Sequence, residues 1–285
     1  MNYDKDSFLA GLSVGLSLRR PVKESPRHCI MFWADTEFSI GFVGRNARNG
    51  MIEYSTDGET WDEWGDLGPG IHSCGKRVML RGSGNTHLCD SNTSSIQGFF
   101  FLNVEGNGTV DVSCAGNIET LLDWETVRDG DHPMMDSWCF HNLFSRSTLR
   151  TAPRLPAPSV PYGGYNGMFS ECPKLVSPPA LPATTLGTLC YNNMFLWCTS
   201  LKKLPALPAT ALPSYCYQDM FLGCSALSLY SIRTAEHPHE FRIPKNGIGT
   251  EGIGSLDNMF YGVGGDGIET PDINTVYYTD YTPVS

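Results

Sequence analysis

The sequence predicts a mixed β and α fold: an N-terminal helix, a small antiparallel β-sandwich domain, then a short leucine-rich solenoid of repeats with a C-terminal β cap. Three observations lead to this prediction. Tyr165 and Tyr191 each open a 26-residue unit, and the two units are identical at 14 of the 26 positions. Residues 28–122 contain short strand-like runs separated by turn residues. An apolar stretch, Phe8–Leu18, lies near the start of the chain.

The first 25 residues are predicted to be an anchoring helix or arm, with a loose terminus as the alternative. The apolar stretch is shorter than the ~18–20 residues that cross a bilayer. The residues before it, Asp4-Lys5-Asp6, are net acidic, whereas a secretory signal has a basic start. The formal net charge of −10 argues against a general nucleic-acid binder, because acidic chains repel phosphate. We therefore expect neither a nucleic-acid partner nor membrane insertion.

Residues 26–128 are predicted to form the β-sandwich-like domain. Met51–Ser55 and the segment that ends at Trp64 are typical of a hairpin, because Asp57-Gly58 supplies a turn with positive φ. Trp61 lies three positions before Trp64, so we expect one of them in the core and the other at the surface. Further strands are expected at Phe38–Val43, Lys76–Arg81, Gly98–Val104 and Thr109–Cys114.

Residues 129–233 hold the repeats of about 26 residues. The spacing of Met194, Phe195 and Cys198 predicts an apolar face on about one and a half helical turns. The Pro-rich segment that follows predicts an extended rung instead, since proline excludes a helix. One unit cannot bury its apolar residues alone, so stacked copies are expected to share a core. The predicted core residues are Phe144, Phe169, Cys172, Phe195, Cys198, Phe221 and Cys224.

Residues 234–285 are predicted to be a degenerate repeat and a C-terminal cap, closed by a strand at Thr275–Thr282. The ten cysteines are expected to be free thiols, because the chain is too large to need disulfide staples and five of them recur in the repeat. Disulfides and structural zinc stay open as alternatives, although no C-x₂-C pair exists.

No motif indicates catalysis. The G-x-G-x-x-G matches that begin at Gly247 and Gly262 lack a strand–turn–helix context. His237-Pro-His239 has no nearby cysteine, and Asp129-Gly-Asp131 lacks the later ligands of a calcium loop. The sequence contains no Walker A, H-E-x-x-H or G-x-S-x-G motif. We therefore expect a non-enzymatic protein with no catalytic, cofactor-binding or metal-binding residue.

The repeat resembles a known family. M-F-x-x-C-x-x-L followed by L-P is similar to the BspA-like, or Treponema-type, leucine-rich repeats over Trp138–Ile232. The variant with C-Y-x-x-M-F and A-L-P-A-T-x-L resembles repeats in surface proteins and in phage or prophage tail proteins of gut bacteria. YSTDGETWDEW resembles the domain that precedes such repeats, and YDKDSFLAGLSVGLSLRR the start of phage structural proteins. The first copy departs from the pattern at Ser147, as a capping repeat would.

The resemblance implies a virion structural protein, in a tail, fibre or other appendage, that presents its repeats for host-cell recognition or attachment. It further implies assembly in the host cytoplasm, multiple copies per particle or a homo-oligomer, and other virion proteins bound through the N-terminal helix. Alternatives are an adhesin on the bacterial cell surface, a capsid decoration protein and a carbohydrate-active enzyme.

Host contact, with a surface glycan or protein, is expected where side chains point outward. Position 197 holds Trp where the other copies have Glu171 and Gly223, so Trp197 is expected to be exposed. The candidate contact residues are Trp197, Lys202, Lys203, Trp61 and Trp64.

Overall fold

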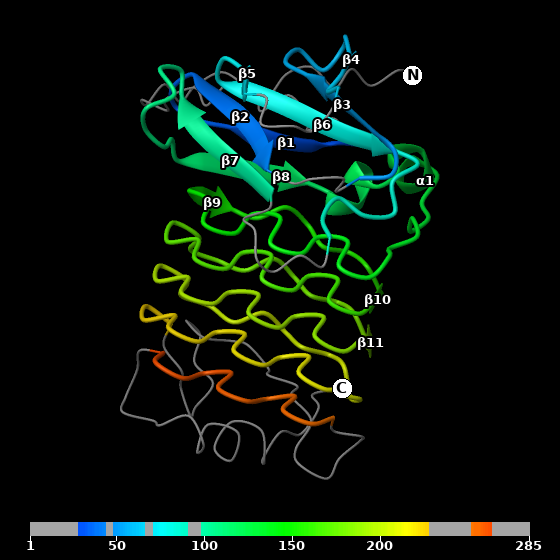
Figure 1. Cartoon of the computed structure of the whole chain (residues 1–285), viewed down its shortest axis with the longest axis vertical. Coiled ribbons are helices and arrows are strands. Elements are labelled where there is room, and N and C mark those ends of the chain that lie inside the picture. Colours follow the sequence, from blue (N-terminus) through cyan, green and yellow to red (C-terminus); the bar gives the residue numbers. More distant parts are fainter. Residues whose placement is uncertain (1–27, 44–47, 66–70, 91–97, 228–251, 264–285) are drawn as a thin grey trace, which may run out of the picture.

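The computed structural model describes residues 28–43, 48–65, 71–90, 98–227 and 252–263 (Figure 1). The predicted N-terminal segment over residues 1–25 and the predicted strand Thr275–Thr282 lie outside these residues. In the described part the chain forms strands and turns, with one 3-10 turn, η1 (Ile118–Leu121), and one five-residue helix, α1 (Trp124–Arg128). No helix among these residues is long and apolar enough to span a bilayer.

The predicted fold class, with a leucine-rich-repeat solenoid that contains helical turns, is therefore wrong. The described residues contain no helix of seven or more residues, and the regular elements are mainly the strands of two sheets. The expected helical turns around Met194 and Phe195 are replaced by consecutive tight turns, in which the amide of Met194 donates to the carbonyl of Tyr191 three residues back. The physical reason is a left-handed residue at every fourth position, which interrupts the continuous dihedrals of a helix.

The N-terminal part is built from two sheets whose strands pair antiparallel, except for β8 and β9 of the larger sheet, which pair in parallel (Figure 1). The larger sheet has six strands in the order β4 (Asp62–Glu63), β3 (Met51–Ser55), β6 (Arg77–Ser83), β1 (Ile30–Trp33), β8 (Val112–Gly116) and β9 (Leu149–Thr151). The smaller has three, in the order β5 (Ile71–Ser73), β2 (Phe38–Val43) and β7 (Gly98–Asn103). The predicted strand Phe38–Val43 and the predicted hairpin are confirmed, whereas β1 was not predicted.

The hairpin turn between β3 and β4 is stabilised by one carboxylate. Gly58 takes a φ of 86°, as the sequence required. Asp57 accepts hydrogen bonds from the amides of Glu59 and Thr60, at 2.8 and 2.9 Å, and from the Ser55 hydroxyl at 2.9 Å. These bonds favour the ionised form, so the pKa of Asp57 lies well below its usual range.

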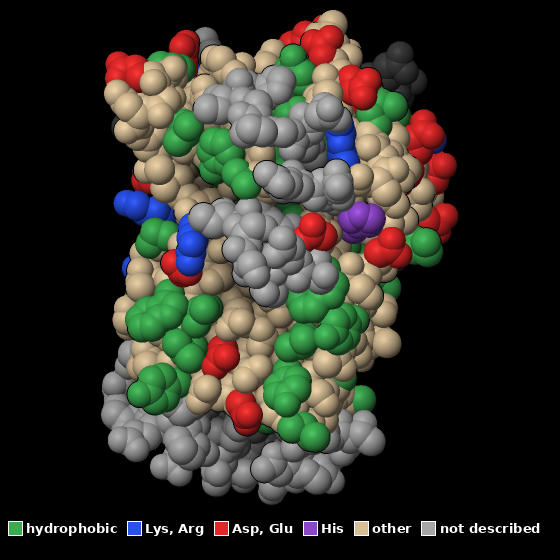
Figure 2. All heavy atoms as spheres, viewed as in Figure 1, with side chains coloured by type: hydrophobic (Ala, Val, Ile, Leu, Met, Phe, Trp, Pro, Cys, Tyr) green, Lys and Arg blue, Asp and Glu red, His purple; other side chains and the backbone are tan. Residues whose placement is uncertain are grey.

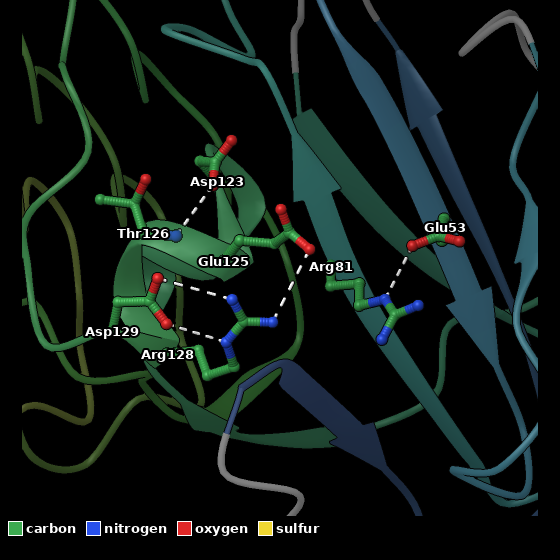
Figure 3. Close-up of polar contacts among 7 residues, drawn as sticks. All are labelled: Glu53, Arg81, Asp123, Glu125, Thr126, Arg128 and Asp129. Atoms are coloured by element: carbon green, nitrogen blue, oxygen red, sulfur yellow. Dashed lines mark hydrogen bonds and ion pairs between the residues drawn. The ribbon is translucent and has the colours of Figure 1, made fainter.

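Helix α1 packs beside the larger sheet (Figure 3). Asp123 caps it by accepting from the Thr126 amide at 2.9 Å, and Arg128 forms an ion pair with Asp129 at 2.9 Å. Arg81 on β6 forms a 2.7 Å ion pair with Glu53 on β3. Its guanidinium carbon also lies 4.0 Å from the ring centroid of Trp61 and 4.3 Å from that of Trp124.

Below the sheets the chain forms five stacked layers, each a ten-residue strip of turns (Figure 1). The strips are residues 138–147, 163–172, 189–198, 215–224 and 254–263. Within a strip the backbone amides alternate between two partners. The amide of Phe169 donates to the Met194 carbonyl of the next layer at 2.9 Å, whereas that of Met168 donates to the Tyr165 carbonyl at 3.2 Å within its own strip. This alternation provides hydrogen-bond partners for the backbone amides of the strip without a helix or a long strand.

Between strips the chain runs through Pro-rich segments. Leu201, Leu204 and Leu207, at every third position, are buried as expected for an extended rung. Two such segments pair as the short parallel strands β10 (Ser159–Val160) and β11 (Thr185–Leu186).

Aromatic rings stack through the layers and into the sheets. One column has neighbouring ring centroids 5.4–5.9 Å apart, in the order Phe99, Phe144, Phe169, Phe195, Phe221 and Phe260. A second runs through Phe140, Tyr165, Tyr191 and Tyr217, with centroids 5.8 Å apart. The sheets and layers consequently share a single hydrophobic core.

The junction between sheets and layers depends on close backbone contact. The amide of Phe99 on β7 donates to the Leu143 carbonyl of the first layer at 2.8 Å. Gly98 has a φ of 109°, and an added Cβ would overlap that same carbonyl oxygen. On the other side of the junction, β8 pairs in parallel with β9.

We predict that Gly98→Ala lowers the free energy of unfolding by more than about 2 kcal/mol, because the methyl group adds a backbone clash to the cost of positive φ. Gly106→Ala is the control, since Gly106 also has positive φ, at 72°, but nothing lies within 4 Å of its added Cβ. Urea unfolding should give a cost of about 1 kcal/mol for the control. Equal losses in the two variants would contradict the close junction.

Candidate functional site

Each layer presents three left-handed residues, four positions apart, with φ between 52° and 73°. Together they form three columns, which we call the outer face. The first column is Trp138, Gly163, Leu189, Tyr215 and Gly254. The second is Asn142, Gly167, Asn193, Asp219 and Asn258. The third is Arg146, Glu171, Trp197, Gly223 and Gly262.

The non-glycine side chains of the outer face are at least partly exposed, whereas the aromatic residues of the two stacked columns between them are buried. In the third layer, Leu189, Asn193 and Trp197 reach solvent, while Tyr191 and Phe195 are buried. The left-handed residues therefore contribute a regular part of the surface of this face.

The second column has the residues that tolerate positive φ best, namely Asn, Asp and Gly. The outer columns do not follow this rule. Trp138, Leu189, Trp197 and Tyr215 are bulky, and a left-handed L-residue costs roughly 1–2 kcal/mol. Glycine occupies the equivalent position in other layers without that cost, so the backbone does not require these side chains.

Trp197 is the most prominent of them. Its side chain is 52% exposed, and its ring lies over Gly223 of the next layer, where an added Cβ would come within 2.6 Å of ring atom Cε3. The glycine leaves room for the ring to lie against the backbone. Gly223 in turn donates from its amide to the carbonyl of Tyr261, whose side chain is 63% exposed.

The first column repeats this arrangement at the other edge. Trp138 lies over Gly163 and Tyr215 over Gly254, in each case with ring atoms within 2.5 Å of the position that a Cβ would take. The exposed Tyr162 packs edge-on against Trp138, with centroids 5.1 Å apart. Figure 2 shows hydrophobic side chains gathered towards both edges of the lower layers, with acidic side chains between them.

The predicted contact residues differ in their exposure to solvent. Trp197 is exposed, as expected, and Lys202 and Lys203 are also exposed, just after the turn in which Leu201 donates to the Cys198 carbonyl at 3.0 Å. Trp64 is buried, so it contributes nothing to a surface; it packs against Tyr54 and Phe99. Trp61 is partly buried under Arg81 and is occupied by that contact.

The predicted repeat core is confirmed, since all seven of its residues are fully buried. The cysteines are free thiols, as expected, and every one is buried. In the repeats, the thiols of Cys172, Cys198 and Cys224 each donate to a phenylalanine carbonyl of the preceding layer at 3.0 Å. Burial raises the pKa of Cys172 and of Cys224 to about 12.

We predict that no cysteine reacts with a thiol reagent in the folded protein, because the thiolate is the reactive form and burial disfavours it. A colorimetric thiol assay at pH 8 should detect no rapid reaction before urea is added and ten thiols after unfolding. Rapid native labelling of even one thiol would contradict the packing described here.

One buried carboxylate was not predicted. Glu119 on η1 has a side chain that is 1% exposed, and both of its oxygens lie 2.9 Å from Nδ1 of His132. Burial raises the pKa of Glu119, while the hydrogen bond and charge of His132 act in the opposite direction. Because Glu119 is buried and its carboxylate contacts His132, we interpret the pair as a structural link between η1 and the segment that leads to the first layer. Sequence spacing gave no signal for it, since thirteen residues separate the partners.

The raised pKa of Glu119 has a consequence for stability. The folded state binds this proton more tightly than the unfolded state, so the contribution is complete below the unfolded pKa and is lost as pH rises through the folded pKa. We predict that Glu119→Gln removes this part of the pH dependence of urea unfolding. The difference between wild type and variant should grow in the variant's favour from about pH 4 upward. A difference that is constant with pH would contradict the assignment.

The layers also differ from the rest of the chain in charge. Residues 137–227 contain six Lys and Arg against two Asp and Glu, a formal charge of +4 in a chain of −10. Arg146 pairs with Glu171 at 3.0 Å, and Arg150 and Lys174 share Asp111. No ion pair involves Lys202 or Lys203 among the described residues.

The described residues hold no group of three or more His, Cys, Asp or Glu side chains that could bind a metal ion. We therefore consider the outer face as the candidate functional surface, because its bulky residues have positive φ. The sequence contains a signal for the second column of this face. In each strip, an Asn, Asp or Gly directly precedes the Leu-Phe or Met-Phe pair.

Comparison of the chain with protein-family models, with curated proteins and with solved structures found no match.

Proposed function

We propose that the protein is a non-enzymatic structural component of a phage virion, in a tail, fibre or other appendage, and that its layers recognise the host cell. The observation that carries the recognition role is the outer face. Bulky side chains stand there in strained left-handed positions that glycine fills elsewhere. Strain that the fold does not require is typical of residues retained for contact with a ligand.

The construction of the molecule supports presentation of that face. The sheets and the layers share one core, and the junction is closed by backbone contacts on two strands, β7 and β8. Such a joint holds the layers in a fixed direction relative to the sheets, as an attachment module on a particle needs. The virion location rests on the resemblance of M-F-x-x-C-x-x-L and A-L-P-A-T-x-L to repeats in tail proteins.

The location is tested on purified particles. We predict that mass spectrometry detects this chain in virions and that gold-labelled antibody marks an appendage. Label over the head would favour a decoration protein instead. Absence from particles, with the chain on the bacterial envelope, would favour an adhesin and overturn the proposal.

Recognition is tested with the purified full-length chain. We predict that it binds host cells and competes with the particles for adsorption, so that adsorption falls as the chain is added. The matched control is the urea-unfolded and diluted chain, checked to remain unfolded. Full adsorption at saturating folded chain would contradict a role in attachment.

A further inference from the structure

We infer that the outer face binds a polysaccharide chain, with the rings of Trp197 and Tyr215 stacked against sugar rings and the second column hydrogen-bonded to hydroxyl groups between them. The inference rests on the proposed recognition function and names its ligand class. Three features of the face lead to it.

The first feature is the fixed position of the rings. Trp197 lies over Gly223 and Tyr215 lies over Gly254, so each ring rests against the backbone of the layer below. A glycine in the lower layer is what makes the flat position possible, because a Cβ there would come within 2.6 Å of the ring. A ring held in this way offers its open side as a rigid platform and loses little entropy when a ligand stacks on it.

The second feature is the polar column between the rings. Asn193 and Asp219 lie in the second column, in the same layers as Trp197 and Tyr215. An amide group can donate to and accept from sugar hydroxyls, and an ionised carboxylate can accept from them. The alternation of apolar edges and a polar centre matches a sugar, which has apolar ring faces and polar edges. The core of a protein interface is instead more continuously apolar.

The third feature is charge. Arg146 and Glu171, the charged residues of the third column, pair with each other at 3.0 Å and so neutralise that edge. Lys202 and Lys203 lie outside the three columns. The face therefore suits contact through ring stacking and hydrogen bonds, including bonds accepted by the Asp219 carboxylate, and the lysines serve as a test of an alternative site based on positive charge.

The decisive variant is Trp197→Gly. Glycine fits the left-handed position better than tryptophan does, and the same column already contains Gly223 and Gly262. The variant should keep or raise the melting temperature. It should also bind polysaccharide extracted from the host envelope at least about tenfold more weakly, because truncation of a central Trp removes a main contact. Trp197→Phe, which keeps a flat ring, should retain most of the binding.

Two control variants lie away from the outer face. Trp33→Ala removes a tryptophan that is 36% exposed from β1, and we expect it to bind as wild type does. The double variant Lys202→Ala/Lys203→Ala removes the two exposed charges beside the third layer, and we expect less than a threefold change. If the lysine variant loses binding while Trp197→Gly keeps it, the assignment to the outer face is wrong.

Treated cells separate the ligand class from the function. We expect the wild-type chain to bind protease-treated cells and to lose binding to periodate-treated cells, in which sugar rings are opened. The reverse result would identify a protein receptor; it would overturn this inference and leave the recognition function standing. No binding to untreated cells would overturn both.

Discussion

The layers depend on one backbone constraint: a residue with positive φ at every fourth position. With it, one set of amides closes turns three residues long and the alternate set donates to the next layer, so that every amide of the second, third and fourth strips has a backbone partner. The arrangement also turns the aromatic and cysteine side chains of the strips inward. Small and aromatic residues can then form continuous columns, such as the one from Phe144 to Phe260.

The same constraint produces the surface on which function is proposed. Because the left-handed residues are the outward ones, a substitution at these positions changes the surface and leaves the core as it is. Glycine and asparagine provide the backbone conformation at low cost, and the occasional tryptophan or tyrosine provides a contact. Each ring needs a small residue in the next layer, as Gly223 is for Trp197. The residue at a position in one layer therefore limits which residues the next layer can have at the same position.

The sequence predicted the content of the layers better than their geometry. The repeat length and the buried positions of Phe195 and Cys198 followed from self-similarity, because columns of identical residues must face the same environment. The helical interpretation failed because apolar spacings of one and three residues also fit consecutive three-residue turns. Asn193 and Asp219, both directly before Met-Phe, were the available sign of positive φ.

In the sheets, Asp57-Gly58 predicted the hairpin between β3 and β4. The burial of Trp64 depended on packing against Phe99, which sequence spacing cannot reveal.

The central claim is most directly tested by comparing glycine with alanine at Leu189, which has a φ of 60°. Val127 in α1 is the reference position, where alanine should be more stable than glycine by about 0.5–1 kcal/mol. At Leu189 the order should reverse, with Leu189→Gly more stable than Leu189→Ala by about 1 kcal/mol in urea unfolding, because only glycine adopts positive φ without strain. The same order at both positions would contradict a left-handed residue in the strip and, with it, the layered backbone proposed to present the binding face.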